Sequence, residues 1–261
     1  ADEVVAEIKK AKGQAVANYD SVTTMEGAER IIKTALDSFG RIDILVNNAG
    51  ILRDRMIFNM TQEEWDSVIK VHLYGHFYCS KFACLAMRAQ RYGRIINTSS
   101  QAGLGNMGQA NYSAAKEGIV GLTRTIARDM GRYGITCNAI RPRAATRLTI
   151  TPDLEANWKR AQAQGLPTLG DYDELRAMMP EHVAQLVVYL ATDAASNING
   201  QVFLVGGNMI AAYPDTAPTK FLFKEAGGSW TAEELVETMP KTLGKDIVNP
   251  SPPSPLEGAK K

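Results

Sequence analysis

The chain has 261 residues, 45% of them hydrophobic, which is enough for one large core or two modest ones. The formal net charge of +1 gives no reason to expect nucleic acid or an anionic membrane surface as a partner. No apolar run approaches the roughly 20 residues that a membrane-spanning helix needs. Cys79, Cys84 and Cys137 are not clustered, which favours buried free thiols in a reducing compartment such as the cytoplasm.

Helix and strand patterns alternate from the start of the chain. Apolar positions at helical spacing predict helices over 1–12 and 25–39. A short strand is expected over 14–19 and another over 42–48. The second of these is too apolar to be exposed on either face, which is typical of sheets covered by helices on both sides.

The alternation continues through the middle of the chain. Thr61 and Glu64 form a capping-box pattern that predicts the start of a long helix over 61–90. The elements expected after it are strand 94–98, helix 109–132, strand 135–142, helices 154–164 and 180–192, and strand 201–207. The segment 167–179 has few periodic apolar positions and is a candidate mobile lid.

This alternation predicts a single-domain α/β fold over 1–213, a doubly wound parallel sheet. Beyond it, 214–248 is expected to be a C-terminal extension with a surface helix at 231–243, and the proline-rich 249–261 a disordered tail. Ligands of such sheets bind at the carboxyl ends of the strands. The polar segments that follow strand ends should therefore share one edge: Asp20, 47–50, Ser99, Ser100 and 142–146.

Tyr112 and Lys116 stand four residues apart on a predicted helix and hence on one face. A tyrosine hydroxyl ordinarily has a pKa near 10, and a lysine ammonium within roughly 4–6 Å lowers it. Such a pair can exchange a proton near neutral pH. The alternative is an ordinary surface pair, but the serines and the glycine-rich loop upstream favour a reaction site.

The loop from Gly103 to Gly108, GLGNMG, fits the G-x-G-x-x-G pattern of a dinucleotide-binding loop. About twenty residues further on, an acidic residue should end a second strand, yet the chain there is still in the helix over 109–132. We therefore interpret this loop as lying on the substrate side. Ser99 and Ser100 precede it and can hydrogen-bond a substrate oxygen, and a cap or turn role is the alternative for each.

Four features together resemble the short-chain dehydrogenase/reductase family over residues 1–210: NNAG at 47–50, the serine pair, Tyr112-Ser-Ala-Ala-Lys116, and the strand ended by Pro142. The resemblance implies a Rossmann-like fold and a nicotinamide cofactor, NAD or NADP with NAD favoured. The stretches AVANYDSV, RDRMIFNMTQEEWDSVIKVHLYG, GNMGQANYSAAK and ASNINGQVF are similar to the (3R)-hydroxyacyl-CoA dehydrogenase part of peroxisomal multifunctional enzyme type 2 and its bacterial relatives.

The resemblance also implies residue roles. Tyr112 would be the general acid/base, Lys116 would lower its pKa and bind the nicotinamide ribose, and a strand-end serine would orient the substrate oxygen. The other residues that the resemblance assigns to the cofactor are Asp20, Ser21, Asn48, Ala49, Gly50, Pro142, Ala144 and Thr146.

The sequence departs from the family pattern in its glycine-rich loop and its serine. No T-G-x-x-x-G-x-G motif occurs in it, so the residue that selects NAD or NADP is missing, and we expect a truncated chain that lacks the first strands of the sheet. The family's serine stands thirteen positions before the tyrosine, which counts back to Ser99. Counting from the loop glycine Gly103 instead gives Ser100, which we favour because local register at the strand end fixes side-chain direction.

Two further departures concern a histidine and an arginine. His72 replaces the asparagine of the usual catalytic tetrad, as in the multifunctional-enzyme branch, and the alternative is a packed helix histidine. His72 and His76 have no carboxylate in the same register, so no metal site is predicted. Arg143, with Arg141 and Arg147 close by, stands where a glycine is usual. These arginines could bind CoA phosphates, an acidic acyl chain or the cofactor, or they could form a solvated basic loop.

The expected function is hydride transfer between a nicotinamide cofactor and a secondary alcohol or ketone, with a 3-hydroxyacyl-CoA/3-oxoacyl-CoA thioester as the small-molecule substrate. A steroid or other ring-ketone dehydrogenase is one alternative, and a non-catalytic subunit that kept the fold is another. Helices 61–90 and 109–132 would pair across a two-fold axis in a homodimer or homotetramer. The peroxisomal matrix replaces the cytoplasm as the expected location if the chain belongs to a larger multifunctional protein.

Overall fold

The computed structural model describes residues 1–146, 149–150, 155–156, 159, 172–215, 217–224, 227–245, 247 and 250. The chain divides into two units, Ala1–Tyr213 and Pro214–Lys261. All the residues singled out above as site candidates fall in the first unit.

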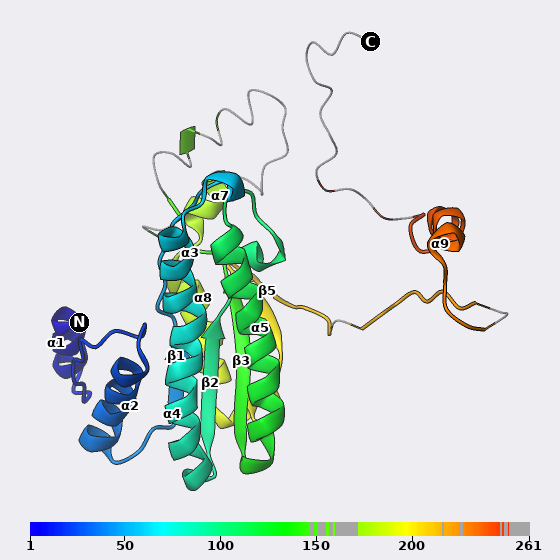
Figure 1. The fold of residues 1–261 in the computed structure, drawn as a ribbon. Coiled ribbons are helices and arrows are strands. Elements are labelled where there is room, and N and C mark those ends of the chain that lie inside the picture. The colour runs from blue at the N-terminus through cyan, green and yellow to red at the C-terminus, as the bar shows by residue number, and fades with distance from the viewer. Residues whose placement is uncertain are drawn as a thin grey trace. The chain divides into compact units, whose positions relative to one another are not determined.

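A five-stranded sheet is the centre of the first unit (Figure 1). Its four parallel strands are β1 (Ile44–Asn47), β2 (Gly93–Thr98), β3 (Ile135–Pro142) and β4 (Val202–Gly206), in that order across the sheet. The fifth strand, β5 (Met209–Ala212), was not predicted and runs antiparallel to β4. The sheet is therefore parallel, as predicted, apart from this one added edge strand. Only two residues join β4 to β5, which is long enough for a hairpin and too short for a crossover.

Helices cover both faces of the parallel strands, which confirms the predicted doubly wound α/β class. On one face lie α4 (Gly75–Gln90) and α5 (Ala110–Met130), and α2 (Met25–Phe39) packs beside α4. On the other face lies α8 (Pro180–Leu190). Successive residues of a strand point to opposite faces, so Ile95 joins the cluster under α4 and α5 while Ile96 joins the cluster under α8.

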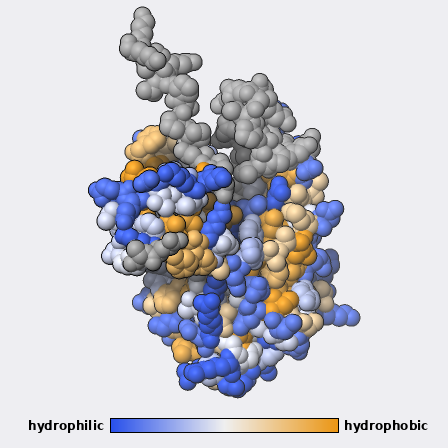
Figure 2. Space-filling model, turned by 90° about the vertical axis from the view of Figure 1, so that its right-hand side faces the viewer, coloured by the Kyte–Doolittle hydropathy of each residue, from blue (hydrophilic) through white to orange (hydrophobic). Residues whose placement is uncertain are grey.

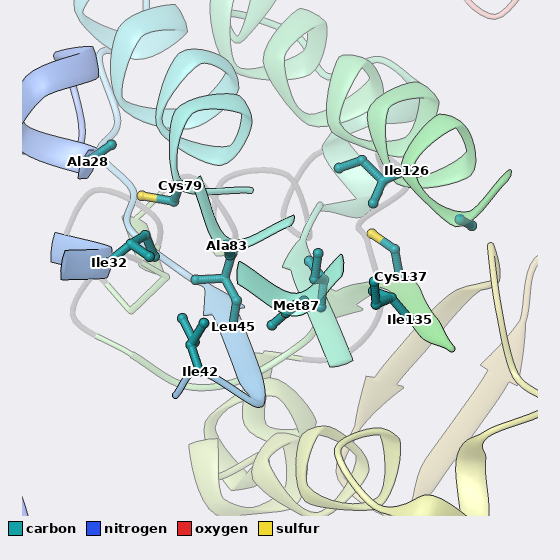
Figure 3. Close-up of a cluster of buried hydrophobic side chains, with 12 residues drawn as sticks. Ala28, Ile32, Ile42, Leu45, Cys79, Ala83, Met87, Ile126, Ile135 and Cys137 are labelled. Carbon is teal, nitrogen blue, oxygen red and sulfur yellow. The ribbon is translucent and has the colours of Figure 1, made fainter. Parts of the chain in front are cut away.

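The larger core cluster lies between the sheet and the helices α2, α4 and α5 (Figure 3). Met87 of α4 and Ile135 of β3 are almost fully buried in it. Cys79 and Cys137 contribute to the same cluster, and all three cysteines of the chain are free thiols. Burial raises the pKa of the Cys79 thiol to about 11, so these cysteines behave as small apolar side chains.

Two predictions for the first strands are wrong. Residues 14–19 form no strand, because no strand among the described residues lies beside them to supply backbone partners. Strand β1 is also more exposed than its composition predicts. Leu45 and Asn47 are buried, whereas Ile44 and Val46 on its other face are 46% and 43% exposed, since α8 contacts β2 and β4.

The long helix predicted over 61–90 is interrupted. The capping box of Thr61 and Glu64 is confirmed and begins α3 (Gln62–Ile69). A π-helical turn at Lys70–Tyr74 then separates α3 from α4. π-Helical turns insert an extra residue into a helix and are frequent at functional sites. The turn contains His72, so it sets the direction of that side chain.

The remaining elements are short. Helix α1 (Asp2–Lys10) buries none of its residues, and α7 (Tyr172–Ala177) occupies part of the predicted lid. The helix predicted over 154–164 lies mostly outside the described residues. The 3-10 turns are Ile57–Asn59, Gln101–Leu104, Gly131–Tyr133 and Asp193–Ala195. No helix in the described ranges is both long and apolar enough to cross a membrane.

The second unit contains α9 (Ala232–Thr238) and a 3-10 turn, Met239–Lys241. Thr231 and Glu234 form a capping box at the start of α9, as expected for a helix that begins there. The predicted helix over 231–243 is too long, because Pro240 cannot donate a backbone hydrogen bond and ends the α-helix. The predicted tail over 249–261 lies outside the described residues except for Pro250.

Candidate active site

Helix α5 places Tyr112 and Lys116 on one face at the carboxyl end of the sheet. Tyr112 is half-buried, whereas Lys116 is 3% exposed. The Lys116 Nζ lies 5.4 Å from the centre of the Tyr112 ring and donates a 2.5 Å hydrogen bond to the backbone oxygen of Thr98, at the end of β2. Asn111 fixes the start of the helix, because its side chain donates to the backbone oxygens of Arg53 and Glu64.

The two serines after β2 point in different directions. The Ser99 hydroxyl donates a 2.7 Å hydrogen bond to the backbone oxygen of Lys116 and is buried, so it ties the strand to α5. Ser100 accepts from the backbone of Ala102 as the cap of the turn at Gln101–Leu104, and its hydroxyl is close enough to the Tyr112 phenol to lower the pKa of that phenol. Of the two hydroxyls, that of Ser100 is therefore the one on the Tyr112 side.

His72 lies between Tyr112 and the turn that follows β1. Its ring meets the Tyr112 ring edge-on, with 5.1 Å between ring centres, and its Nε2 contacts the backbone oxygen and nitrogen of Ile51 at 2.8 and 3.1 Å. A Cβ on Gly50 would come within 2.6 Å of the His72 ring, so only glycine allows this approach. Burial and the nearby Lys116 lower the pKa of His72 to about 4, which makes the ring neutral at physiological pH.

The electrostatics of Tyr112 differ from the prediction. Burial raises the pKa of the Tyr112 phenol, the Ser100 hydrogen bond lowers it, and the Asp54 carboxylate raises it. Lys116 does not lower it as predicted, because burial holds the pKa of the lysine itself at about 7 and its ammonium turns toward Thr98. Ser100 is the group that favours the Tyr112 phenolate.

The residues predicted to contact a cofactor come from several segments, and Asp20 and Ser21 follow no strand because residues 14–19 form none. Asn48 and Ala49 follow β1 and are exposed. Ser21 is exposed as well, and Asp20 forms a 2.7 Å ion pair with Arg30 of α2, which holds the pKa of the Asp20 carboxyl below its usual range. Asp20 is thus held beside α2 by its ion pair with Arg30.

The segment after β3 is shaped by backbone contacts. Pro142 ends β3, Ala144 is buried, and the backbone nitrogen of Thr146 donates to the hydroxyl of Thr149 at 2.8 Å. The expected cluster of three basic side chains is only partly covered by the described residues. Arg143 is half-buried after the strand, but Arg141 belongs to β3 itself, and Arg147 lies outside the described residues.

His76, one turn after His72, is also buried, and burial lowers its pKa to about 3. Within the described ranges, no three histidine, cysteine or carboxylate side chains gather in a way that could hold a metal ion.

Two residues that sequence reasoning missed are Asn111 and Glu117, which anchor the ends of the Tyr112–Lys116 turn. The only signal for them is their position beside the tyrosine and the lysine.

Comparisons with known proteins agree with this geometry. The family model described as enoyl-(acyl carrier protein) reductase matches residues 1–209. A crystal structure of a short chain dehydrogenase from Mycobacterium avium superposes with a TM-score of 0.79 at 42% identity, covering 99% of this chain and 82% of that one. The chain belongs to the short-chain dehydrogenase/reductase family.

Two relatives indicate which members of the family this chain is similar to. Peroxisomal multifunctional enzyme type 2 of Mus musculus is 47% identical over 211 residues, which are 80% of this chain and 26% of that protein. A hydroxyacyl-CoA dehydrogenase of Mycobacterium tuberculosis is 41% identical over 252 residues, covering 91% of this chain and 74% of that protein. The chain thus spans only about a quarter of the mouse enzyme.

Proposed function

We propose that the chain is the catalytic part of a nicotinamide-dependent oxidoreductase that interconverts 3-hydroxyacyl-CoA and 3-oxoacyl-CoA thioesters. The observation that carries the proposal is the convergence of Ser100, Tyr112 and Lys116 at the carboxyl end of the sheet in a member of this family. The relative named hydroxyacyl-CoA dehydrogenase supports the choice of thioester, because the similarity covers most of both chains.

Proton transfer is the task of the Tyr112 phenol. In the oxidation direction Tyr112 takes the proton of the substrate hydroxyl, and it returns a proton in the reduction direction. The Ser100 hydroxyl has one hydrogen, which favours the phenolate form of Tyr112 before substrate binds and is donated to the same substrate oxygen once substrate is bound. Neutral His72 packs edge-on against the phenol and fixes the ring plane.

The donor set of the site fits the nicotinamide end of the cofactor. Lys116 offers ammonium hydrogens for ribose hydroxyls, and exposed Asn48 offers an amide beside them. The segment from Pro142 to Thr146 would lie by the carboxamide, and Asp20 and Ser21 would lie by the adenine nucleoside. When bound, the nicotinamide supplies the hydride acceptor or donor. We propose NAD rather than NADP.

The proposed assembly is a homodimer or homotetramer in a reducing compartment. Exposed apolar side chains on α4 and in the π-helical turn, Tyr74, Phe77 and Leu85, support pairing with a second copy. Figure 2 faces a different side of the molecule, the right-hand side of Figure 1, where apolar side chains also gather between hydrophilic ones. The three free thiols support the cytoplasm, with the peroxisomal matrix as the alternative suggested by the name of the mouse relative.

A substrate and cofactor panel tests the proposal. The full-length gene product that carries these residues is assayed with a 3-hydroxyacyl-CoA, the matching acyl-carrier-protein thioester and a hydroxysteroid, each with NAD and with NADP. We expect kcat/KM to be highest for the CoA thioester with NAD. The ratio over the other combinations should be about tenfold or more, because binding sites commonly discriminate between related substrates by such a factor. Absence of nicotinamide-dependent turnover on every substrate would contradict the proposed activity.

A further inference from the structure

Two arginines of the sheet are almost completely buried and are built alike. Arg94 in β2 pairs with Asp193 at 3.0 Å, and Arg141 in β3 pairs with Glu117 at 2.7 Å. Each guanidinium also stacks on a tyrosine ring, 4.5 Å from its centre in both cases. Each pair joins a side chain held in the sheet to a carboxylate on a neighbouring element.

The two ion pairs differ in their position along the strand and in the number of hydrogen bonds that the guanidinium donates. Arg94 stands at the amino end of its strand and donates to three backbone oxygens besides Asp193. Arg141 stands one residue from the carboxyl end of β3, at the edge of the sheet that bears the active site. Its Nε and Nη1 are buried without a hydrogen-bond partner in the described part of the chain, where Glu117 is its ionic partner. A buried arginine in this position depends strongly on its carboxylate.

Glu117 connects Arg141 to the catalytic loop. It follows Lys116 directly on α5, and its Oε2 lies 2.8 Å from the point that a Cβ on Gly103 would occupy. Gly103 belongs to the 3-10 turn Gln101–Leu104, whose cap is Ser100, and its backbone nitrogen donates to the Ser100 backbone oxygen at 3.1 Å. The carboxylate therefore lies against the loop that carries the substrate-side serine.

We propose that the Arg141–Glu117 ion pair is a positioning device that holds the Gln101–Leu104 turn on α5 and thereby keeps the Ser100 hydroxyl against Tyr112. The proposal rests on the proposed function, because it assigns to the pair an effect on the reaction that Ser100 and Tyr112 perform. Neither Arg141 nor Glu117 is assigned a contact with substrate.

The exposure of the two side chains explains the direction of the effect. The Arg141 side chain is 3% exposed and is fixed in the sheet, whereas the Glu117 side chain is 44% exposed and could turn outward into water. The ion pair holds the carboxylate inward against Gly103. Without it, the turn loses a packing partner beside the catalytic serine, and a displacement of about 1 Å at such a site costs up to a hundredfold in rate.

A double-mutant cycle tests this coupling in the full-length gene product with 3-hydroxyacyl-CoA and nicotinamide cofactor. We expect Glu117→Ala to lower kcat by about tenfold, with the KM of the cofactor unchanged within twofold. In a Ser100→Ala background the same change should lower kcat by less than about twofold, because a residue that acts through Ser100 has no effect once Ser100 is gone. Asp193→Ala breaks the matched pair at the other end of the sheet and should leave kcat unchanged.

The pH profile of kcat supplies a second readout that a loss of stability alone does not move. The groups that face the Tyr112 phenol are Ser100, His72, Lys116 and Asp54. Of these, Ser100 lowers the pKa of Tyr112, so its displacement raises that pKa. The rising limb of the oxidation rate should therefore move to higher pH in Glu117→Ala and not in Asp193→Ala.

Different outcomes separate the two proposals. Equal losses from Glu117→Ala with and without Ser100, an unmoved pH profile, or an equal loss from Asp193→Ala would each overturn the positioning role. Full activity of Ser100→Ala and Tyr112→Phe would overturn the proposed function instead. If Glu117→Ala does not fold, Glu117→Gln keeps the size of the side chain and removes its charge. It should then show the same dependence on Ser100 with a smaller loss.

Discussion

Replacement of Lys116 by methionine should remove a pH dependence from the unfolding free energy. The Lys116 side chain is 3% exposed, and burial lowers its pKa from 10.5 to about 7. Between these two values the unfolded chain binds a proton that the folded protein does not bind. Stability therefore rises with pH across this window and is lost as pH falls from 10.5 toward 7.

The size of the effect follows from the two pKa values. Between pH 7 and pH 9, the lysine makes the unfolding free energy of the wild type rise by about 2 kcal/mol. Lys116→Met has no titrating group at this position and should lack the rise. The loss of the hydrogen bond to Thr98 adds an offset that does not depend on pH.

Urea unfolding at constant ionic strength and several pH values between 6.5 and 9.5 measures the difference. The exposed Lys81 of α4 provides the control, because Lys81→Met should follow the wild type at every pH. A difference between wild type and Lys116→Met that stays constant within about 0.5 kcal/mol from pH 7 to pH 9 would refute the inference. It would mean that Lys116 keeps its charge in the folded protein across this range.

Three further predictions concern the neighbouring groups. Ser99→Ala should cost about 1 kcal/mol in urea unfolding, because it removes the hydroxyl that donates to the backbone oxygen of Lys116. It should change kcat by less than about threefold, and a loss of activity equal to that of Ser100→Ala would contradict the separate roles of the two serines. Gly50→Ala should cost roughly 1–3 kcal/mol and lower kcat, because the new methyl group would lie 2.6 Å from the His72 ring; unchanged melting and turnover would show that the ring can move freely. Cys137 should resist alkylation in the folded protein, since it is buried and burial raises its thiol pKa; mass spectrometry that finds it labelled within minutes would contradict the packing of β3.

The strand, loop and helix that form the candidate site could be predicted because their signals are local. The apolar run that became β2, the glycine-rich loop and the Tyr112–Lys116 spacing each lie within a few turns of the chain. The preference for Ser100 over Ser99 rests on the same local register. In the structure the Ser99 hydroxyl donates to the Lys116 backbone, whereas the Ser100 hydroxyl lowers the pKa of the Tyr112 phenol.

The rest depends on partners distant in the sequence. Whether residues 14–19 form a strand depends on a neighbouring strand, which composition does not reveal. The π-helical turn at Lys70–Tyr74 has the same apolar pattern as an α-helix, so the direction of His72 could not be predicted. From the sequence, Arg141 is predicted to belong to a basic loop. Its burial depends on its hydrogen bond to Glu117, which stands 24 positions earlier in the chain.

The central claim is that the Tyr112 phenol transfers the proton in a nicotinamide-dependent oxidation. The most direct test is the turnover of a 3-hydroxyacyl-CoA by Tyr112→Phe in the full-length gene product. Phenylalanine keeps the ring that packs against His72, so the melting temperature should be nearly unchanged. The account predicts that kcat falls by about a hundredfold or more. A variant that keeps its kcat within about threefold of the wild type would contradict it.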